Sequence, residues 1–187
     1  SFKQASFAYP DQQQQALKEL NITIQPGEKV ALLGKIGSGK STMARLLMGL
    51  YSPNSGSVLI DDTDVRQIDP FDLRRNVSFV VQDSWLFSGS VRDNITSGSV
   101  HVSDEALLRA AEIAGVQDFL GDHPKGYDLV LRERGEGLSS GQRQAISIAR
   151  GLVGERPILI MDEPTSMMDT ASEAKFVERM SGYVEDK

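Results

Sequence analysis

A glycine-rich segment at residues 34–41 constrains the fold of this chain more than any other feature. It reads Gly-Lys-Ile-Gly-Ser-Gly-Lys-Ser and satisfies the pattern G-x-x-x-x-G-K-[ST] in full. The apolar run at residues 30–33 predicts a buried strand before it, and the apolar spacing of residues 43–50 predicts a helix that opens at Lys40. A strand, a glycine turn and a helix in this order form the usual setting of a phosphate-binding loop.

The residue types in this segment suit the chemistry of phosphate. Glycines let backbone N–H groups turn inward around phosphate oxygens, and the start of a helix adds a partial positive charge. Lys40 supplies a point charge to the outer phosphates, and the hydroxyl of Ser41 is a suitable ligand for Mg²⁺. The alternative is a glycine turn made only for close packing, and the strand and helix expected on either side favour phosphate binding.

Composition narrows the class of protein. The chain has 187 residues, 40% of them hydrophobic and 25% charged, which is ordinary for one globular domain. A net charge of -6 argues against a nucleic-acid partner, and the absence of cysteine excludes disulfides and thiolate metal sites. No apolar run reaches the length of a membrane span, and no signal peptide is visible. Because the first residue is Ser1, we expect an excised part of a longer polypeptide.

Polar side chains follow two further apolar runs. Residues 158–161 predict a strand that ends in Asp162 and Glu163, and residues 77–81 predict a strand that ends at Gln82. Asp162 is expected to hold Mg²⁺ through a water molecule, and Glu163 to act as a base or to orient a hydrolytic water. Ligands of parallel sheets lie at the carboxyl ends of strands, so Gln82 is expected to reach the metal or the attacking water.

Three segments leave alternatives open. Tyr9 either stacks on a nucleotide base or covers the core from an edge strand. The cluster at residues 85–87, Trp-Leu-Phe, either fills the core or anchors a partner. Residues 132–144 form a second glycine-rich turn before a helix, which either receives an anion or is only an N-cap. His101 and His123 have no ligand-spaced neighbours and are interpreted as solvated loop residues.

Taken in order, these motifs resemble the nucleotide-binding domain of ATP-binding cassette (ABC) proteins over nearly the whole chain. Residues 34–41 match the Walker A loop, Gln82 the Q-loop and Tyr9 the A-loop. The segment 138–142, Leu-Ser-Ser-Gly-Gln, matches the LSGGQ signature, and residues 166–169 match the D-loop. Asp162 and Glu163 match the Walker B aspartate and the catalytic glutamate. The resemblance implies that the chain binds ATP and Mg²⁺.

The resemblance assigns site residues to three roles. These are catalytic, Glu163 and Gln82; metal-binding, Ser41, Gln82 and Asp162; and nucleotide-binding, Tyr9, Gly34, Lys35, Ile36, Gly37, Ser38, Gly39, Lys40, Ser41, Thr42, Ser139, Ser140, Gly141 and Gln142.

The expected fold is α/β, a P-loop NTPase with a mostly parallel central sheet from strands at Val30, Val77 and Ile158. An N-terminal antiparallel β ribbon precedes that sheet, and an α-helical insertion at about residues 91–151 carries the signature. Residues 1–187 are therefore expected to form a single nucleotide-binding domain. The N-terminal ribbon is expected from the alternating patterns of residues 2–9 and 17–24.

Residues 85–95 and 133–137 look like those of exporters. Together with residues 126–128 and 143–145, they look most like those of bacterial type I protein secretion ATPases. This resemblance implies ATP-dependent head-to-tail pairing with a second nucleotide-binding domain and a transmembrane domain in the same polypeptide. It also implies a periplasmic adaptor, an outer-membrane channel and a place at the cytoplasmic face of the inner membrane, with the chain itself soluble. A lipid, peptide or drug exporter, a regulatory module and a soluble ABC ATPase of repair, chromosome organisation or translation stay open.

The chain departs from the family pattern at two points. Ser140 stands where the signature usually has glycine, which adds a side chain where backbone is expected to approach the γ-phosphate in the opposing subunit. The chain also ends at Lys187, before the strand that would carry the switch histidine, and neither His101 nor His123 matches that position. We therefore expect the chain to bind nucleotide better than it hydrolyses it.

Overall fold

The computed structural model describes residues 1–12, 14–82, 85–99, 101–121 and 123–185. The chain divides into two compact units, Ser1–Val77 and Ser78–Lys187, with the boundary at the first residue of strand β5 (Val77–Val80). Each unit has its own cluster of buried apolar side chains. The expectation of one catalytic domain with a helical insertion at residues 91–151 stays a prediction.

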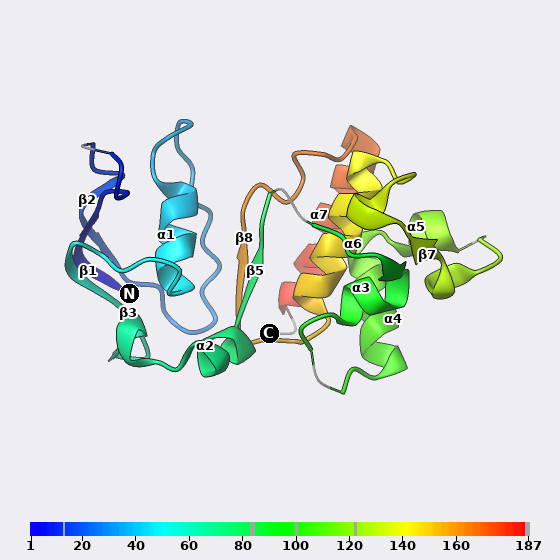
Figure 1. Cartoon of the computed structure of the whole chain (residues 1–187), viewed down its shortest axis with the longest axis horizontal. Coiled ribbons are helices and arrows are strands. Elements are labelled where there is room, and N and C mark those ends of the chain that lie inside the picture. Colours follow the sequence, from blue (N-terminus) through cyan, green and yellow to red (C-terminus); the bar gives the residue numbers. More distant parts are fainter. Residues whose placement is uncertain (13, 83–84, 100, 122, 186–187) are drawn as a thin grey trace. The chain divides into compact units, whose positions relative to one another are not determined.

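The first unit contains a four-stranded antiparallel sheet (Figure 1). Its strands are β1 (Phe2–Phe7), β2 (Leu17–Ile22), β3 (Ser55–Ile60) and β4 (Thr63–Asp64), in the order β2-β1-β3-β4. Strand β1 pairs antiparallel with both neighbours, so that Phe2 lies opposite Ile22 on one side and Val58 on the other. The sheet confirms the antiparallel ribbon expected from the N-terminal alternation.

Two α-helices and a short 3-10 helix complete this unit: α1 (Lys40–Leu47), η1 (Val65–Gln67) and α2 (Pro70–Asn76). Met43 and Leu46 from α1 join the apolar core formed with the side chains of the sheet. This burial fixes α1 against the sheet, because apolar area removed from water is the main favourable term in packing. Helix α2 begins after Asp69, whose carboxylate accepts a hydrogen bond from the N–H of Phe71.

The strand expected at residues 30–33 is absent from this structure. These residues form no strand pairing within the described part of the chain, and Leu33 is 94% exposed. A strand requires a neighbour that supplies hydrogen bonds, and the strands of the first unit pair with one another instead. The apolar run that leads into the glycine-rich segment is therefore irregular here.

Two pairs of strands belong to the second unit. Strand β5 pairs with β8 (Ile158–Met161), and the N–H of Asp162, just after β8, donates to the carbonyl of Val80 at the end of β5. The carboxyl ends of these strands therefore lie together, and the strands run in the same direction. The second pair, β6 (Gly89–Ser90) and β7 (Val130–Leu131), is antiparallel.

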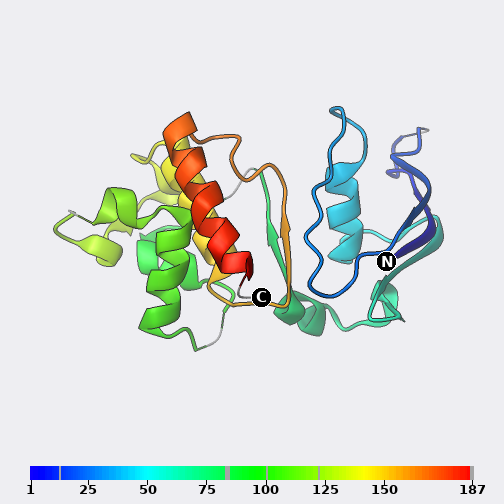
Figure 2. The same ribbon diagram turned by 180° about the vertical axis from the view of Figure 1, so that it is seen from behind.

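Helices dominate the rest of the second unit. They are α3 (Val91–Thr96), α4 (Asp104–Ala114), α5 (Gln117–Leu120), α6 (Ser140–Leu152) and α7 (Thr170–Glu185), with 3-10 turns η2 (Gly126–Asp128) and η3 (Glu133–Gly135). Helix α6 contacts α3 and α4. Helix α7 (red) lies beside α4 (green), as Figure 2 shows. The helix expected to follow the second glycine-rich turn is confirmed as α6.

Gly151 shows why α6 packs closely on β5. A Cβ at this position would lie 2.4 Å from the side chain of Val80, which no real side chain tolerates. The hydroxyl of Ser78 in β5 also donates to the carbonyl of Gly151 at 2.7 Å. The glycine therefore brings the end of α6 against the strand that leads to Gln82.

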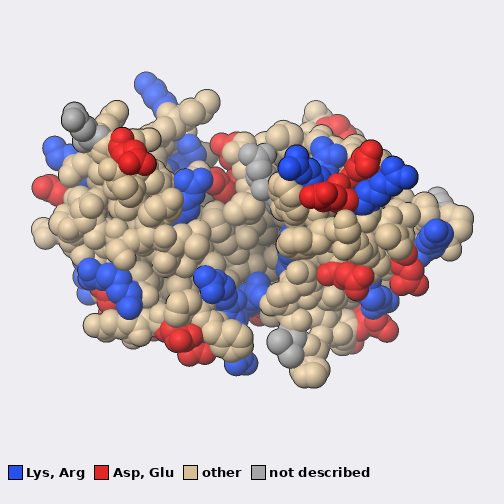
Figure 3. Space-filling model, viewed as in Figure 1, with Lys and Arg blue, Asp and Glu red and all other residues tan. Residues whose placement is uncertain are grey.

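The face of each unit that Figure 3 shows is mixed in charge. On the visible face of both units, lysine and arginine side chains are interspersed with aspartate and glutamate (Figure 3). Among the described residues, no helix combines the length and the apolar character that crossing a bilayer requires.

Candidate active site

The glycine-rich segment leads directly into α1, as the sequence predicts. Gly37 and Gly39 have φ angles of +80° and +92°, the left-handed region that favours glycine, and Gly39 is the residue before α1. A Cβ on Gly34 would lie 2.6 Å from the hydroxyl oxygen of Ser38. Side chains at these glycine positions would therefore disturb the backbone conformation. Residues 34–41 are called the phosphate loop below.

The ammonium group of Lys40 lies at the phosphate loop. It donates hydrogen bonds to the carbonyl oxygens of Gly34 at 2.9 Å and Lys35 at 3.2 Å. Two carbonyl partners leave a third donor of the ammonium group for another acceptor. A phosphate oxygen is a stronger partner than either carbonyl, because a charge-assisted hydrogen bond is shorter and stronger than one to a neutral acceptor.

Tyr9 lies beside the helix that the phosphate loop opens. Its ring meets Phe7 and Tyr51 edge-on, with centroids 5.0 and 5.2 Å away. Its hydroxyl lies 3.1 Å from the hydroxyl of Thr42, a buried residue of α1. Tyr9 therefore covers the core of the first unit, and the same side chain reaches the predicted nucleotide-binding segment. Its stacking on a base stays a prediction.

In the second unit, Gln82 and Glu163 lie together at the end of the β5 and β8 pair. The side-chain amide nitrogen of Gln82 donates to Glu163 Oε2 at 2.8 Å. Asp162, partly buried, is fixed through its backbone bond to Val80. The amide of Gln82 thus holds the carboxylate of Glu163, and Asp162 next to it supplies a second carboxylate. A site that orients both a water molecule and a metal ion requires two such groups.

The backbone of Glu163 is in an unusual conformation. Its φ angle is +49°, which is uncommon outside glycine and costs free energy. The carbonyl of Glu163 accepts hydrogen bonds from the N–H of Ser166 at 3.2 Å and from the hydroxyl of Ser166 at 3.0 Å. Ser166 thereby fixes the turn that presents Glu163. Strained residues held by their surroundings are typical of functional sites.

The signature segment at residues 138–142 opens helix α6 with a capping box. The hydroxyl of Ser139 accepts from the N–H of Gln142, and the side-chain oxygen of Gln142 accepts from the N–H of Ser139 at 2.8 Å. A Cβ on Gly141 would lie 3.2 Å from the carbonyl oxygen of Met167, so the glycine allows close approach of the D-loop. Ser140 is exposed at the first helical position.

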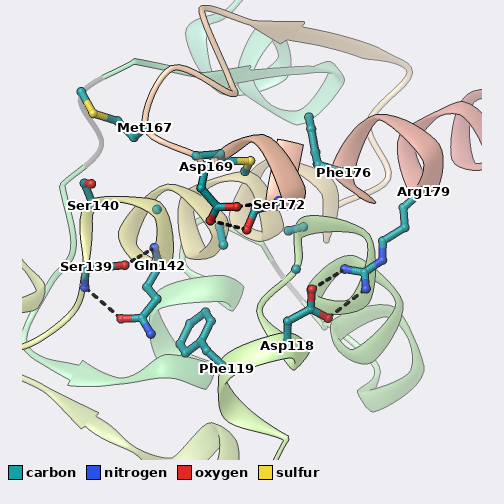
Figure 4. Close-up of a pocket in the computed structure, with 15 residues that line it drawn as sticks. Asp118, Phe119, Ser139, Ser140, Gln142, Met167, Asp169, Ser172, Phe176 and Arg179 are labelled. Atoms are coloured by element: carbon teal, nitrogen blue, oxygen red, sulfur yellow. Dashed lines mark hydrogen bonds and ion pairs between the residues drawn. The ribbon is translucent and has the colours of Figure 1, made fainter. Parts of the chain in front are cut away.

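A pocket of about 430 Å³ lies beside the signature segment, within the second unit (Figure 4). Its wall includes Ser139 and Gln142 from the start of α6, and Asp169 from the D-loop. Asp118 and Arg179 face each other across another part of the wall, with hydrogen bonds of 2.8 and 3.2 Å between guanidinium and carboxylate. The remaining lining residues are Ala114, Gly115, Phe119, Ser140, Gly141, Ala145, Met167, Met168, Ser172 and Phe176.

Asp169 connects the D-loop to α7. Its carboxylate accepts from the N–H groups of Ala171 and Ser172, both at 3.0 Å, and from the hydroxyl of Ser172 at 2.8 Å. Hydrogen bonds from the N–H and the hydroxyl of Ser172 lower the pKa of the Asp169 carboxyl below its ordinary value of 3.8. The side chain is therefore an ionised cap on the first turn of α7.

The side chains implied for Mg²⁺, Ser41 in the first unit and Asp162 and Gln82 in the second, are of types that suit a metal bound mainly through substrate. Among the described residues, no group of three or more His, Asp or Glu side chains gathers into a metal cage. Mg²⁺ commonly uses one or two protein ligands together with phosphates and water. Ser41 and Asp162 provide oxygen donors, and Gln82 bonds Glu163 through nitrogen, which leaves its amide oxygen as an acceptor.

In the cluster at residues 85–87, one side chain fills the core and two lie at the surface, where they could anchor a partner. Leu86 is completely buried, whereas Trp85 and Phe87 are 49% and 52% exposed. Arginine guanidinium groups lie over both exposed rings, Arg134 at 4.5 Å from the ring of Trp85 and Arg150 at 5.3 Å from that of Phe87. One apolar residue anchors the segment, and two aromatic residues remain available at the surface.

Sequence reasoning missed the residues that hold this segment. Asn94 is buried, and its side chain bonds both the N–H and the carbonyl of Phe87, each at 2.9 Å. Arg150 bonds the carbonyl oxygens of Trp85 at 2.9 Å and Asn94 at 2.7 Å. Only tertiary contacts identify this role. The two histidines agree with their interpretation, since His101 and His123 are exposed in loops.

Comparison with known proteins identifies the family. The model of the family described as ABC transporter matches residues 17–166. The leukotoxin translocation ATP-binding protein LktB of Pasteurella haemolytica-like sp. (strain 5943B) is 42% identical over 96% of this chain and 25% of its own length. The ATP-dependent lipid A-core flippase of Syntrophus aciditrophicus is 43% identical over 94% of this chain and 29% of its own.

A solved structure has the same fold. A bacterial Atm1-family ABC exporter with ATP bound superposes with a TM-score of 0.91 at 38% identity, over 98% of this chain and 32% of the exporter chain. The chain thus spans about a third or less of the length of the proteins that it matches. These matches bear out the α/β P-loop NTPase fold expected from the motifs. The chain belongs to the ABC transporter family and is an ATP-binding domain of that family.

Proposed function

We propose that this chain supplies ATP hydrolysis to an exporter at the cytoplasmic face of the inner membrane. The observation that carries the proposal is the hydrogen bond between Gln82 and Glu163, next to Asp162, at the ends of two parallel strands. The arrangement supplies a carboxylate for the attacking water and a second one for a metal ion. The similar proteins include a translocation ATP-binding protein, a flippase and an exporter, which supports the direction of transport.

Each residue has a separate task in the proposed hydrolysis. The phosphate loop and Lys40 bind the triphosphate, and Glu163 accepts a hydrogen bond from the attacking water and orients it toward the γ-phosphorus. Ser41, Asp162 (through water) and the amide oxygen of Gln82 hold Mg²⁺. When bound, Mg²⁺ neutralises charge that develops on the phosphate oxygens. Tyr9 stacks on the base, because an aromatic ring offers a broad apolar face.

The signature segment serves a second copy of the domain. Ser139 to Gln142 provide hydroxyl and amide groups at the start of a helix of 13 residues, where an anion is favoured by the helix dipole. In the proposed head-to-tail pair, this segment contacts the triphosphate held by the phosphate loop of the partner. Ser140 either donates its hydroxyl to a phosphate oxygen or hinders closure.

The proposed exporter couples pairing of the domains to a transmembrane domain of the same polypeptide. The exposed rings of Trp85 and Phe87 are suited to that contact, because arginines hold them in fixed positions at the surface. Type I protein secretion through a periplasmic adaptor and an outer-membrane channel is the preferred form. A lipid exporter is the second candidate, because the flippase and the toxin translocation protein are about equally similar to this chain.

The test uses the whole natural protein in inside-out membrane vesicles with ATP outside. We expect ATP hydrolysis and uptake of a substrate, both lost in Glu163→Gln and both retained in Glu178→Gln, an acid-to-amide change at an exposed position of α7. Uptake of an unfolded secretion substrate identifies protein export, whereas movement of labelled lipid identifies the second candidate. ATP hydrolysis without movement of either class would contradict the exporter proposal.

A further inference from the structure

Arg45 makes a contact that the motifs do not predict. It lies on α1, one helical turn after Thr42, and its guanidinium donates a hydrogen bond to the hydroxyl of Tyr9 at 2.8 Å. The same Tyr9 hydroxyl lies 3.1 Å from the hydroxyl of Thr42. Thr42 and Arg45 of α1 thus both contact the hydroxyl of Tyr9. Tyr9 lies 33 residues before Thr42 in the sequence.

The chemistry of arginine determines which group donates in the hydrogen bonds among Arg45, Tyr9 and Thr42. Arginine has only donors, so the phenolic oxygen of Tyr9 is the acceptor from Arg45. The phenolic hydrogen can then be donated to the hydroxyl oxygen of Thr42.

The ring of Tyr9 is held along its length. Phe7 and Tyr51 meet it at interplanar angles of 80° and 86°, and Arg45 and Thr42 hold its hydroxyl. Thr42 is 6% exposed and β-branched, so its own side chain has little rotational freedom. A ring fixed in this way loses little further freedom when it contacts a ligand.

We propose that Arg45 is a positioning residue for ATP, which acts through Tyr9 and sets the preference for a nucleotide over bare polyphosphate. Loss of Arg45 frees the hydroxyl end of Tyr9, so the ring must be ordered when the base binds. The triphosphate itself is held by the phosphate loop and Lys40, which do not depend on Tyr9. The inference rests on the proposed function, because it requires that Tyr9 contacts the base.

Arg45 could instead attract phosphates through its charge, and the two roles predict different ligand dependence. A charge acts on any polyphosphate, whereas a positioning role acts only on a ligand that carries a base. Inorganic tripolyphosphate has the charge of the triphosphate without the base. It therefore separates attraction by Arg45 from positioning of Tyr9.

The experiment measures the affinity of the whole natural protein for Mg-ATP and for magnesium tripolyphosphate by calorimetry. The variants are Arg45→Met, Tyr9→Phe, the double variant, Arg45→Lys, and Arg74→Met as a control for the same charge change at an exposed site on α2. Arg45→Met should weaken ATP binding roughly threefold to tenfold, the effect of one hydrogen bond to a charged donor at a partly exposed site. Its affinity for tripolyphosphate should stay within about twofold, and Arg74→Met should leave both affinities unchanged.

The double variant provides the sharpest readout. If Arg45 acts through the Tyr9 hydroxyl, Tyr9→Phe together with Arg45→Met should be no weaker than Tyr9→Phe alone, and Arg45→Lys should recover part of the loss. Equal weakening of both ligands, additive losses in the double variant, or unchanged ATP affinity in Arg45→Met would each overturn the inference. A wild-type protein that binds tripolyphosphate and ATP equally would overturn the base contact of Tyr9, and one that binds neither would overturn the proposed function itself.

Discussion

The side-chain amide of Gln82 donates a hydrogen bond of 2.8 Å to the carboxylate of Glu163. The two residues are 81 positions apart in sequence and come together because β5 and β8 end side by side. In this arrangement one oxygen of Glu163 is already engaged by an amide. A water molecule that Glu163 orients can bond to Oε1 or to the second lone pair of Oε2, because an ionised carboxylate has about four acceptor sites.

Substitution of Gln82 tests whether this contact assists hydrolysis. We expect Gln82→Ala to lower the hydrolysis rate about 10- to 100-fold, because the Glu163 carboxylate and the metal each lose an orienting group. ATP affinity should change little, since the phosphate loop is intact. Steady-state hydrolysis and equilibrium binding measured on the same preparation separate the two effects. A hydrolysis rate equal to that of wild type would remove Gln82 from the catalytic group.

Glu163→Gln tests the role of the carboxylate. It should lower hydrolysis by about 100-fold or more while ATP still binds, because an amide cannot accept a proton from water. The ATP-bound pair of domains should then accumulate, which sedimentation in the presence of Mg-ATP detects. Glu178→Gln is the matched control and should behave as wild type. The assignment fails if Glu163→Gln and wild type hydrolyse ATP at the same rate.

Lys40→Ala tests the phosphate loop. Removing the ammonium group should weaken ATP binding about 10- to 100-fold, the effect of losing a charge-assisted hydrogen bond to phosphate. Lys35→Ala removes a lysine from the same segment but keeps its backbone N–H, so its affinity should stay close to that of wild type. Calorimetric titration checks both variants. Equal losses in the two variants would show that general positive charge, and not the position of Lys40, determines affinity.

Ser139→Ala tests the cap of α6. The substitution removes the hydroxyl that accepts from the N–H of Gln142 and should lower the free energy of unfolding by about 1 kcal/mol. Ser140→Ala changes the neighbouring exposed serine and should alter stability by less than about 0.5 kcal/mol. Denaturant unfolding measures both. Similar stability for the two variants would mean that the capping box contributes little.

The pH dependence of stability should report the cap that Asp169 makes on α7. Because hydrogen bonds lower the pKa of the folded carboxyl below 3.8, its stabilising effect is fully present above that pH and is lost as the pH falls toward the lower folded pKa. Asp169→Ala should therefore be less stable than wild type at neutral pH, and the difference should shrink below pH 3.8. Thermal unfolding across this range checks the sign. A difference that grows in acid would contradict it.

Much of the local structure is predictable from sequence because local chemistry determines it. The helix starts at Lys40, Pro70 and Ser140 follow from a glycine turn, an Asp-Pro pair and a capping box, each of which acts within four residues. The pairing of Gln82 with Glu163 at a common edge follows from placing polar residues at the ends of two apolar runs. Such signals depend little on distant parts of the chain.

Contacts set by tertiary packing were not predictable. Nothing in the spacing of Arg45 or Asn94 indicates that one holds Tyr9 and the other holds Phe87, because both contacts depend on how separate elements meet. At residues 30–33 the sequence instead predicts a strand, which these described residues do not form. The apolar composition favours a buried strand, but composition cannot specify which strand supplies the hydrogen bonds.

The most direct test of the central claim is titration of the whole natural protein with Mg-ATP, with binding followed by calorimetry and association by sedimentation. We predict saturable binding of one ATP per copy of this chain, pairing of the domains that requires ATP, and a shift of both to about 10- to 100-fold higher ATP concentration in Lys40→Ala. Folded protein that shows no heat of binding and no change in association with Mg-ATP would contradict the account.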